Sequence, residues 1–124
     1  MELKLQYKSL VESLRLLSSF YEDQKSCLPD FVNPKDEVAA AFGDAFLLLP
    51  QLIEEGLLSQ NAIASIIRCF NWMELANRNE DIADLESFKN HESWQKVREL
   101  AAKALDAMNE DKGKPDLSGI DWMD

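Results

Sequence analysis

The segment from Asn33 to Gly56 constrains the fold more than any other part of the chain, because it is strongly apolar and sharply bounded. Asn33 is suited to cap the first turn of a helix, and Pro34 suits the position after the cap. Gly56 is a natural left-handed stop. Apolar residues recur between these ends at three- and four-residue spacing, as on one face of a helix: Val38, Ala41, Phe42, Ala45, Phe46, Leu49, Leu52 and Ile53. The segment is therefore predicted to form the central helix of an α-helical domain.

Three features inside this segment lead to further expectations. Pro50 lacks an amide hydrogen and collides with the carbonyl four residues back, so we expect a kink or a break there. Leu47, Leu48 and Leu49 continue the apolar stripe without a polar gap, so more than one side of the helix should be covered. Gly43 costs roughly 1 kcal/mol relative to alanine inside a helix, which indicates close helix packing or an approach surface at that position, with packing the preferred interpretation.

Helical periodicity also marks the rest of the chain. A first helix is predicted over residues 2–21, facing the core, and residues 22–32 are expected to form a connector. Further helices are predicted over residues 60–77, 80–89 and 91–109. No alternating run rich in β-branched residues occurs, so no sheet is expected.

The same periodicity assigns caps and buried sides to these helices. Ser59 and Asn90 are expected to cap the helices that begin at residues 60 and 91. The buried side of helix 60–77 is predicted to contain Ile63, Ile66, Ile67, Phe70 and Met73, with Leu75 a candidate for the same side. Trp72 falls off that stripe. In helix 80–89, the side chains expected to point inward are those of Ile82, Leu85 and Phe88.

Length and composition favour one domain. The chain has 124 residues, of which 46% are hydrophobic, enough for a single core. We therefore predict an all-α, single-domain bundle of about five helices over residues 1–109, followed by an acidic C-terminal tail over residues 110–124. The tail contains Leu117, Ile120, Trp122 and Met123.

The charge excludes some classes of partner. With 13 Lys and Arg against 23 Asp and Glu, the formal charge is −10, which repels nucleic acid and anionic membrane surfaces. The sequence contains no signal-peptide pattern and no apolar run long enough to span a membrane, so a cytoplasmic protein is predicted. Cys27 and Cys69 lack a disulfide or metal spacing and are expected to be reduced and partly buried.

Motifs for catalysis or cofactor binding are missing from the sequence. His91, the only histidine, is expected to be a surface or helix-capping residue, and the four glycines form no phosphate loop. No catalytic residue, metal ligand or cofactor is predicted. One acidic cluster contains Glu80, Asp81, Asp84 and Glu86, of which the first three are expected to share a helix face. Paired carboxylates of this kind bind magnesium in all-α nucleotide pyrophosphohydrolases, but half of such a site is missing, so a solvated helix face is the preferred interpretation.

The distribution of charge is more informative than its total. Residues 22–60 contain eight acids and two bases, and residues 74–92 contain six acids and two bases, whereas the first and last long helices are near neutral. If the two acidic regions are neighbours, they form a negative face that attracts a basic partner; the alternative is that the acids only keep the bundle soluble. The residues predicted to bind the partner are Asp36, Glu37, Asp44, Glu54, Glu55, Glu80, Asp81, Asp84 and Glu86, with Trp72 as an apolar anchor.

Three helix-patterned stretches are similar to one known class of protein. They are LPDFVNPKDEVAAAFGDAFLLL, LIEEGLLSQNAI and HESWQKVRELAAKAL. Over roughly residues 28–108 the chain resembles the small, acidic, all-helical immunity proteins of bacterial polymorphic-toxin and contact-dependent growth-inhibition systems. The resemblance implies tight, stoichiometric binding of a cognate toxin domain, often a basic nuclease, whose active site or nucleic-acid groove is blocked. These families share no invariant site, so the residues named above follow from charge placement alone.

Two other functions are left open by the sequence. The first is a structural or adaptor bundle that dimerises through its first helix. The second is the magnesium-dependent nucleotide pyrophosphohydrolase already considered. The predicted partner is a basic protein toxin, with neither nucleic acid nor membrane as a ligand, and the oligomeric state is undetermined.

Overall fold

The computed structural model describes residues 2–116, so the predictions for Leu117, Ile120, Trp122 and Met123 lie outside it. The described chain is all-α and contains no strand, which confirms the predicted fold class. Its helices are α1 (Leu3–Ser18), α2 (Tyr21–Cys27), α3 (Pro34–Leu47), α4 (Leu49–Glu54), α5 (Gln60–Arg78), the 3₁₀ helix η1 (Glu80–Ile82), α6 (Leu85–Asn90) and α7 (Glu92–Ala107). No helix within these residues is both long enough and apolar enough to cross a lipid bilayer.

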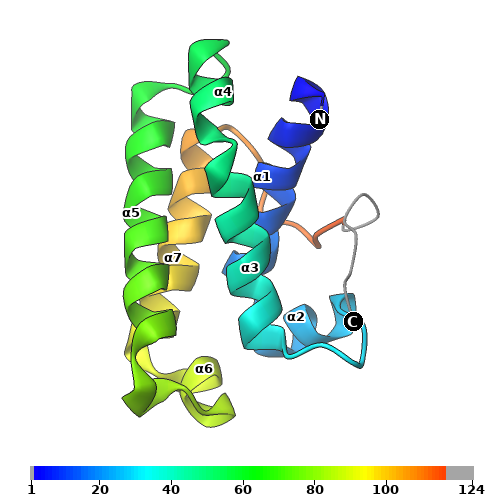
Figure 1. The fold of residues 1–124 in the computed structure, drawn as a ribbon, viewed down its shortest axis with the longest axis vertical. Helices are drawn as coiled ribbons and strands as arrows, with labels where there is room; N and C mark the ends of the chain where they lie inside the picture. The colour runs from blue at the N-terminus through cyan, green and yellow to red at the C-terminus, as the bar shows by residue number, and fades with distance from the viewer. Residues whose placement is uncertain (1, 117–124) are drawn as a thin grey trace.

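Four long helices form the bundle (Figure 1). Helix α5 packs on α7, α7 on α1, α1 on α3, and α3 on α5, so the four helices close around a shared core. The short helices lie at the ends of the bundle, with α4 at one end and α2 and α6 at the other. The largest fully buried side chains come from all four long helices and include Leu14, Phe42, Ile66 and Trp94.

The helix predicted to be central is not the most buried one. Helix α3 buries only Val38, Ala39, Phe42 and Ala45, whereas eight residues of α1 and seven of α7 are buried. The expectation that Leu47 is covered is wrong, since its side chain is 76% exposed. The reason is the register of α3, because Leu47 follows the exposed positions Ala40 and Asp44 on the solvent side of the helix, whereas Leu49 lies beyond the end of α3 and is buried.

The predicted start, break and end of the helical segment 33–56 are confirmed. The Asn33 side chain accepts a hydrogen bond from the Asp36 amide at 3.2 Å, which caps α3. Pro50 lies in the first turn of α4, directly after the predicted break. Gly56 has a φ of +72° and follows the end of α4.

The first predicted helix is shorter than expected, and part of the predicted connector is helical. The Ser18 and Ser19 hydroxyls donate hydrogen bonds to the Arg15 carbonyl at 3.1 and 2.7 Å. The buried Gln24 side chain donates to the Leu16 carbonyl at 3.0 Å. These side chains satisfy carbonyls that continued helix would have used, so the chain turns after Ser18 and starts α2.

The second half of the chain shows one confirmed cap and two corrections. Ser59 caps α5 as predicted, because its hydroxyl accepts from the Ala62 amide at 3.1 Å. The single helix predicted over residues 80–89 is instead η1 followed by α6, since Asp84 accepts a hydrogen bond from the Ser87 amide as the N-cap of α6. The cap of α7 is His91, whose Nδ1 accepts from the Ser93 amide at 3.1 Å, rather than Asn90. The capping role expected for His91 is therefore confirmed.

Three apolar side chains predicted to point inward are exposed. They are Ile67, Leu75 and Leu85. Helix α5 presents one stripe to the core, containing Ala62, Ile66, Cys69, Met73 and Ala76, and both Ile67 and Leu75 lie on the opposite side. Trp72 is partly exposed, as its position off the predicted stripe indicated.

Both cysteines are free thiols, as predicted. Cys27 is half-buried, and Cys69 is fully buried, with its Sγ 3.8 Å from the Val97 carbonyl. Burial raises the pKa of the Cys69 thiol to about 12. Cys69 therefore stays protonated at neutral pH and behaves as a small apolar core residue.

Residues 110–116 lie along α1 and belong to the described fold. The Tyr7 hydroxyl donates to Glu110 at 2.8 Å, and Arg15 Nε donates to the Asp111 carbonyl at 2.8 Å. The Asp116 amide donates to Glu12 at 2.8 Å. Burial, followed by the hydrogen bond to Glu110, raises the pKa of Tyr7 to about 12. The first part of the predicted acidic tail is thus held against the bundle.

Gly43 offers a direct test of packing. The close packing expected around it is wrong, because a Cβ added at Gly43 would meet no atom within 4 Å. Since alanine has the higher helix propensity, Gly43→Ala is expected to raise the free energy of unfolding by about 0.5–1 kcal/mol, measured by urea denaturation. Gly56→Ala is the matched control and should destabilise, because Gly56 has a φ of +72°. A loss of stability in Gly43→Ala would show that the space around α3 is not free.

Candidate protein-binding surface

Of the nine acidic residues predicted to bind a partner, five lie on α3 or at the end of α4. Asp36 and Glu37 lie in the first turn of α3, Asp44 lies further along it, and Glu54 and Glu55 lie at the end of α4. Along α3 the solvent-facing positions are Asp36, Ala40, Asp44 and Leu47, at steps of four, four and three residues. We define the α3–α4 surface by seven residues, the half-buried Glu37 and the exposed Asp36, Asp44, Leu47, Ile53, Glu54 and Glu55.

The carboxylates of the α3–α4 surface form almost no ion pairs with lysine or arginine side chains of the described chain. Asp36 lies 3.8 Å from Lys35 Nζ. In the described part of the chain, Glu37, Asp44, Glu54 and Glu55 form no ion pair. Their charges are therefore uncompensated at short range, and the surface attracts cationic groups.

Apolar side chains are exposed beside these acids. Leu47 is the most exposed residue of this kind on α3, and Ile53 is exposed on α4. The half-buried rings of Phe46 and Phe70 stack at a centroid distance of 3.9 Å, which joins α3 to α5. Such a combination of apolar area and charge is typical of protein interfaces.

The other four acids form a second group, away from α4. Glu80, Asp81, Asp84 and Glu86 lie on or beside η1 and α6, at the opposite end of α5 from Glu54 and Glu55 (Figure 1). Helix α5 has 19 residues, so it separates the two ends by about 28 Å. The nine acids therefore do not gather in one compact patch.

Part of this second group is occupied with local capping. Asp84 accepts from the amide and the hydroxyl of Ser87 at 3.1 and 2.7 Å, and these hydrogen bonds lower the pKa of Asp84. Glu86 accepts from the Asn90 side chain at 2.9 Å. Among residues 2–116, no group of three or more His, Cys, Asp or Glu side chains is placed to hold a metal ion. Asp84 lies before α6 and Asp81 within η1, so the helix face expected to hold the cluster is not formed.

Trp72 lies on α5, outside the α3–α4 surface. It borders a shallow hollow with Ala64, Ile67, Arg68 and Asn71. This part of α5 contains no carboxylate, and Arg68 gives it a positive charge. The structure thus separates Trp72 from the acids with which it was grouped.

Sequence reasoning missed Leu47 as a surface residue, although a signal was present. Leu47 follows Asp44 by three residues, and Asp44 follows Ala40 by four, so Leu47 falls on the polar side of α3. The unbroken run of leucines obscured this register. Comparison of the chain with protein-family models, with curated proteins and with solved structures gives no match. Function is therefore inferred from the charge, exposure and geometry of the described residues.

Proposed function

We propose that this chain is a cytoplasmic immunity protein that binds and neutralises a cognate bacterial toxin domain through the α3–α4 surface. The observation that supports it is the combination of a leucine that is 76% exposed and four carboxylates that form no ion pair within residues 2–116. Uncompensated carboxylates gain most from binding a partner rich in lysine and arginine. Leu47 supplies apolar area at the same place.

The proposed mechanism is occupation of a basic groove on the toxin. Asp44, Glu54 and Glu55 contact lysines and arginines that would otherwise hold phosphates of a nucleic acid. Because these cations are already paired in the complex, the nucleic acid is excluded. Leu47 and Ile53 bury apolar area beside the charge pairs. Charge attraction raises the rate of capture, and apolar burial lengthens the lifetime of the complex.

Reversing charge on the α3–α4 surface tests this proposal. The toxin is found by expressing the products of neighbouring genes and selecting one whose growth inhibition this chain relieves. Asp44→Lys, Glu54→Lys and Glu55→Lys are then combined in one variant, which is expected to slow association at low salt by at least about tenfold. Association rates at two salt concentrations and relief of growth inhibition are the measurements.

A matched variant controls for total charge. Glu80→Lys, Asp81→Lys and Glu86→Lys change the net charge equally, but at the other end of α5. This variant is expected to bind with a smaller change in rate. If it loses binding while the first variant keeps it, the interface lies at η1 and α6. If no neighbouring product is neutralised and the chain sediments as a dimer, the adaptor hypothesis replaces the immunity hypothesis.

A further inference from the structure

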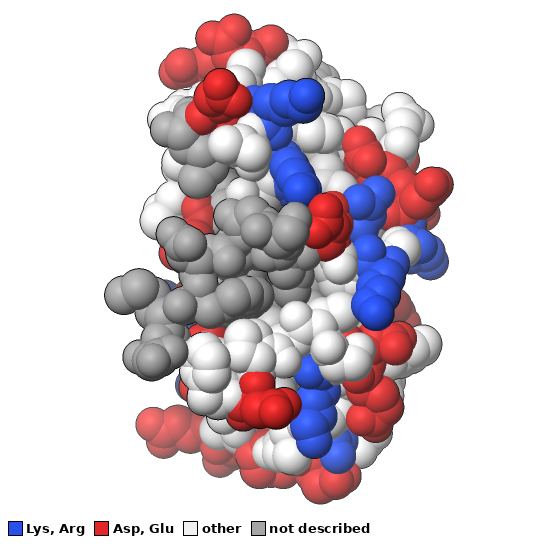
Figure 2. Space-filling view, turned by 90° about the vertical axis from the view of Figure 1, so that its right-hand side faces the viewer, with Lys and Arg blue, Asp and Glu red and all other residues white. Residues whose placement is uncertain are grey.

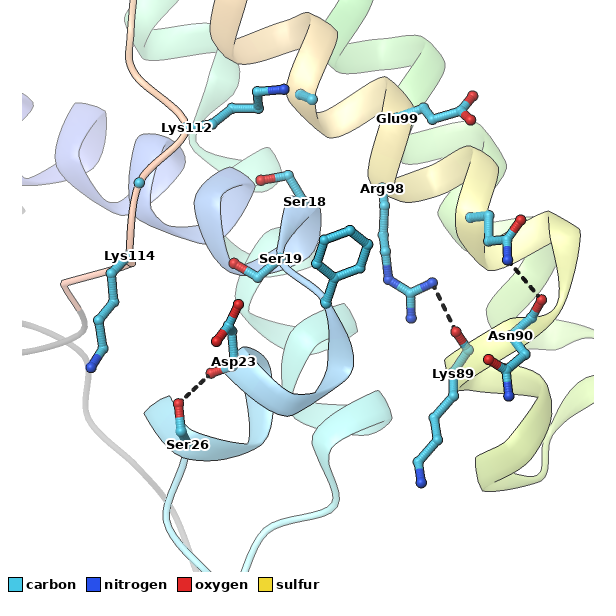
Figure 3. Close-up of a pocket in the computed structure, with 14 residues that line it drawn as sticks. Ser18, Ser19, Asp23, Ser26, Lys89, Asn90, Arg98, Glu99, Lys112 and Lys114 are labelled. Atoms are coloured by element: carbon cyan, nitrogen blue, oxygen red, sulfur yellow. Dashed lines mark hydrogen bonds between the residues drawn. The ribbon is translucent and has the colours of Figure 1, made fainter.

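A groove of about 920 Å³ lies between the α1–α2 junction, helices α6 and α7, and the segment after α7 (Figure 3). Four of its lining residues are cations, namely Lys89, Arg98, Lys112 and Lys114, and two are carboxylates, Asp23 and Glu99. This excess of bases is opposite to the chain as a whole, which has 13 bases and 23 acids. On the face shown in Figure 2, lysine and arginine side chains lie among acidic ones, and further acids lie at its upper and lower ends.

Arg98 is the most informative residue of the groove. It is only 9% exposed, and its guanidinium donates to the carbonyls of Phe88 at 2.6 Å and Lys89 at 3.3 Å. Its Nε atom is buried and has no hydrogen-bond partner among residues 2–116. No ion pair to Arg98 is formed within the described residues. A buried charge without a counter-ion is unfavourable, and an anion entering the groove would supply one.

The other cations line the groove from different parts of the chain. Lys112 extends from the segment after α7 toward that helix, and Arg98 descends from α7 toward the backbone of Lys89 (Figure 3). Lys112 and Lys114 form no ion pair with any described residue. Glu99 points away from Arg98 in the same view. The groove therefore offers charged donors and few competing carboxylates.

One aromatic side chain and the size of the groove narrow the class of ligand. Phe20 lines the groove and is 76% exposed, so its ring is available for stacking. The volume falls within the range of small-molecule sites. Each of two side-chain amides at the edge already uses one of its two N–H donors, because Gln95 donates to the Asn90 carbonyl at 3.0 Å and Asn90 donates to Glu86. The cations and the ring are therefore the main groups for recognition.

We propose that this groove binds a small molecule with two or more phosphate groups next to an aromatic part, the chemistry of a nucleoside di- or triphosphate. The phosphates contact Arg98 and Lys112, and the base stacks on Phe20. The groove shares no residue with the α3–α4 surface, so this site stands or falls independently of toxin binding.

Calorimetric titration of the full chain with ATP, ADP, tripolyphosphate and adenosine tests the site. ATP and ADP are expected to bind with one-to-one stoichiometry, tripolyphosphate more weakly, and adenosine not measurably. Arg98→Met and, separately, Lys112→Met combined with Lys114→Met should each weaken ATP binding at least about tenfold, since each removes a charged contact. The lysine variant alters only exposed side chains and keeps the test decisive if Arg98→Met does not fold.

Two further variants locate the ligand within the groove. Phe20→Ser should weaken ATP and leave tripolyphosphate unchanged, because only ATP has a base to stack. Lys103→Met removes an exposed α7 lysine outside the groove and should leave ATP binding unchanged. The proposal is overturned if ATP and tripolyphosphate fail to bind the wild-type chain, or if ATP binds equally to the groove variants and to Lys103→Met. Binding of an acidic peptide in place of ATP would also overturn it and assign the groove to a protein partner.

Discussion

Replacing Arg15 with methionine is expected to lower the free energy of unfolding by about 3 kcal/mol, because it leaves a buried carboxylate without its cation. The Glu12 side chain is 5% exposed, and its Oε2 accepts a hydrogen bond from Arg15 at 2.7 Å. The same guanidinium donates to the Asp111 carbonyl and lies 3.5 Å from Glu110. In the variant, Glu12 retains the hydrogen bond from the Asp116 amide but no cation. Urea denaturation followed by circular dichroism measures the loss.

Two comparisons separate burial of the pair from a general effect of charge. Lys8 pairs with Asp116 at 3.1 Å, and both side chains are well exposed, so Lys8→Met is expected to cost less than about 1 kcal/mol. Adding Glu12→Gln to Arg15→Met removes the buried charge and should restore part of the loss. Trypsin should also cleave after Lys112 faster in Arg15→Met, since Arg15 holds the Asp111 carbonyl. Equal losses for Lys8→Met and Arg15→Met would show that the Glu12–Arg15 pair is unimportant.

The parts of the fold that sequence predicted correctly are those set by local chemistry. Asn33 and Ser59 each satisfy the amide three residues ahead, so their effect needs no distant contact. Pro50 and Gly56 act through their own backbone angles and hydrogen-bonding groups. The all-α class follows equally from spacing within each segment.

The parts that sequence did not predict depend on distant contacts. The end of α1 at Ser18 depends on Gln24, which donates to the Leu16 carbonyl only after the chain has turned back. The sequence could not show which helix is the most buried, because α1, α3 and α7 all contain apolar stripes. How far each helix is covered depends on which other helices pack against it. A helix that is apolar in sequence can therefore remain the outer one.

Charge counted by segment shows the same limit at the two candidate sites. Lys89 lies in a region counted as acidic, and Lys112 and Lys114 lie in the predicted acidic tail, so no segment indicated a basic groove. The fold brings them together with Arg98. Conversely, the acids of α4 and those of η1 and α6 were grouped by sign, and the fold places them at opposite ends of α5. The net charge of a segment can be counted from the sequence, but a charged surface patch depends on which segments the fold places side by side.

Replacing Trp94 with alanine is expected to lower the free energy of unfolding by about 4 kcal/mol, the largest effect of any change considered. Trp94 is 1% exposed, and its ring meets the Phe88 ring edge-on at a centroid distance of 4.9 Å. The Phe88 ring in turn packs against the Tyr21 ring, with 6.1 Å between the ring centroids. The cavity left by removing the indole would therefore open beneath α2 and α6 as well as beside α7. Chemical denaturation with urea measures the change.

Phenylalanine at the same position separates loss of volume from loss of polarity. The Trp94 Nε1 atom is buried and has no hydrogen-bond partner in the described part of the chain, and burying such a donor costs roughly 1–3 kcal/mol. Trp94→Phe removes that donor and keeps an aromatic ring against Phe88, so it is expected to cost less than half as much as Trp94→Ala. Trp72→Ala is the surface control and should cost under about 1 kcal/mol, because Trp72 is only partly buried. If Trp94→Phe proves as damaging as Trp94→Ala, the indole nitrogen has a partner that stabilises the fold, and the interior beneath α2 and α6 is more polar than the described contacts indicate.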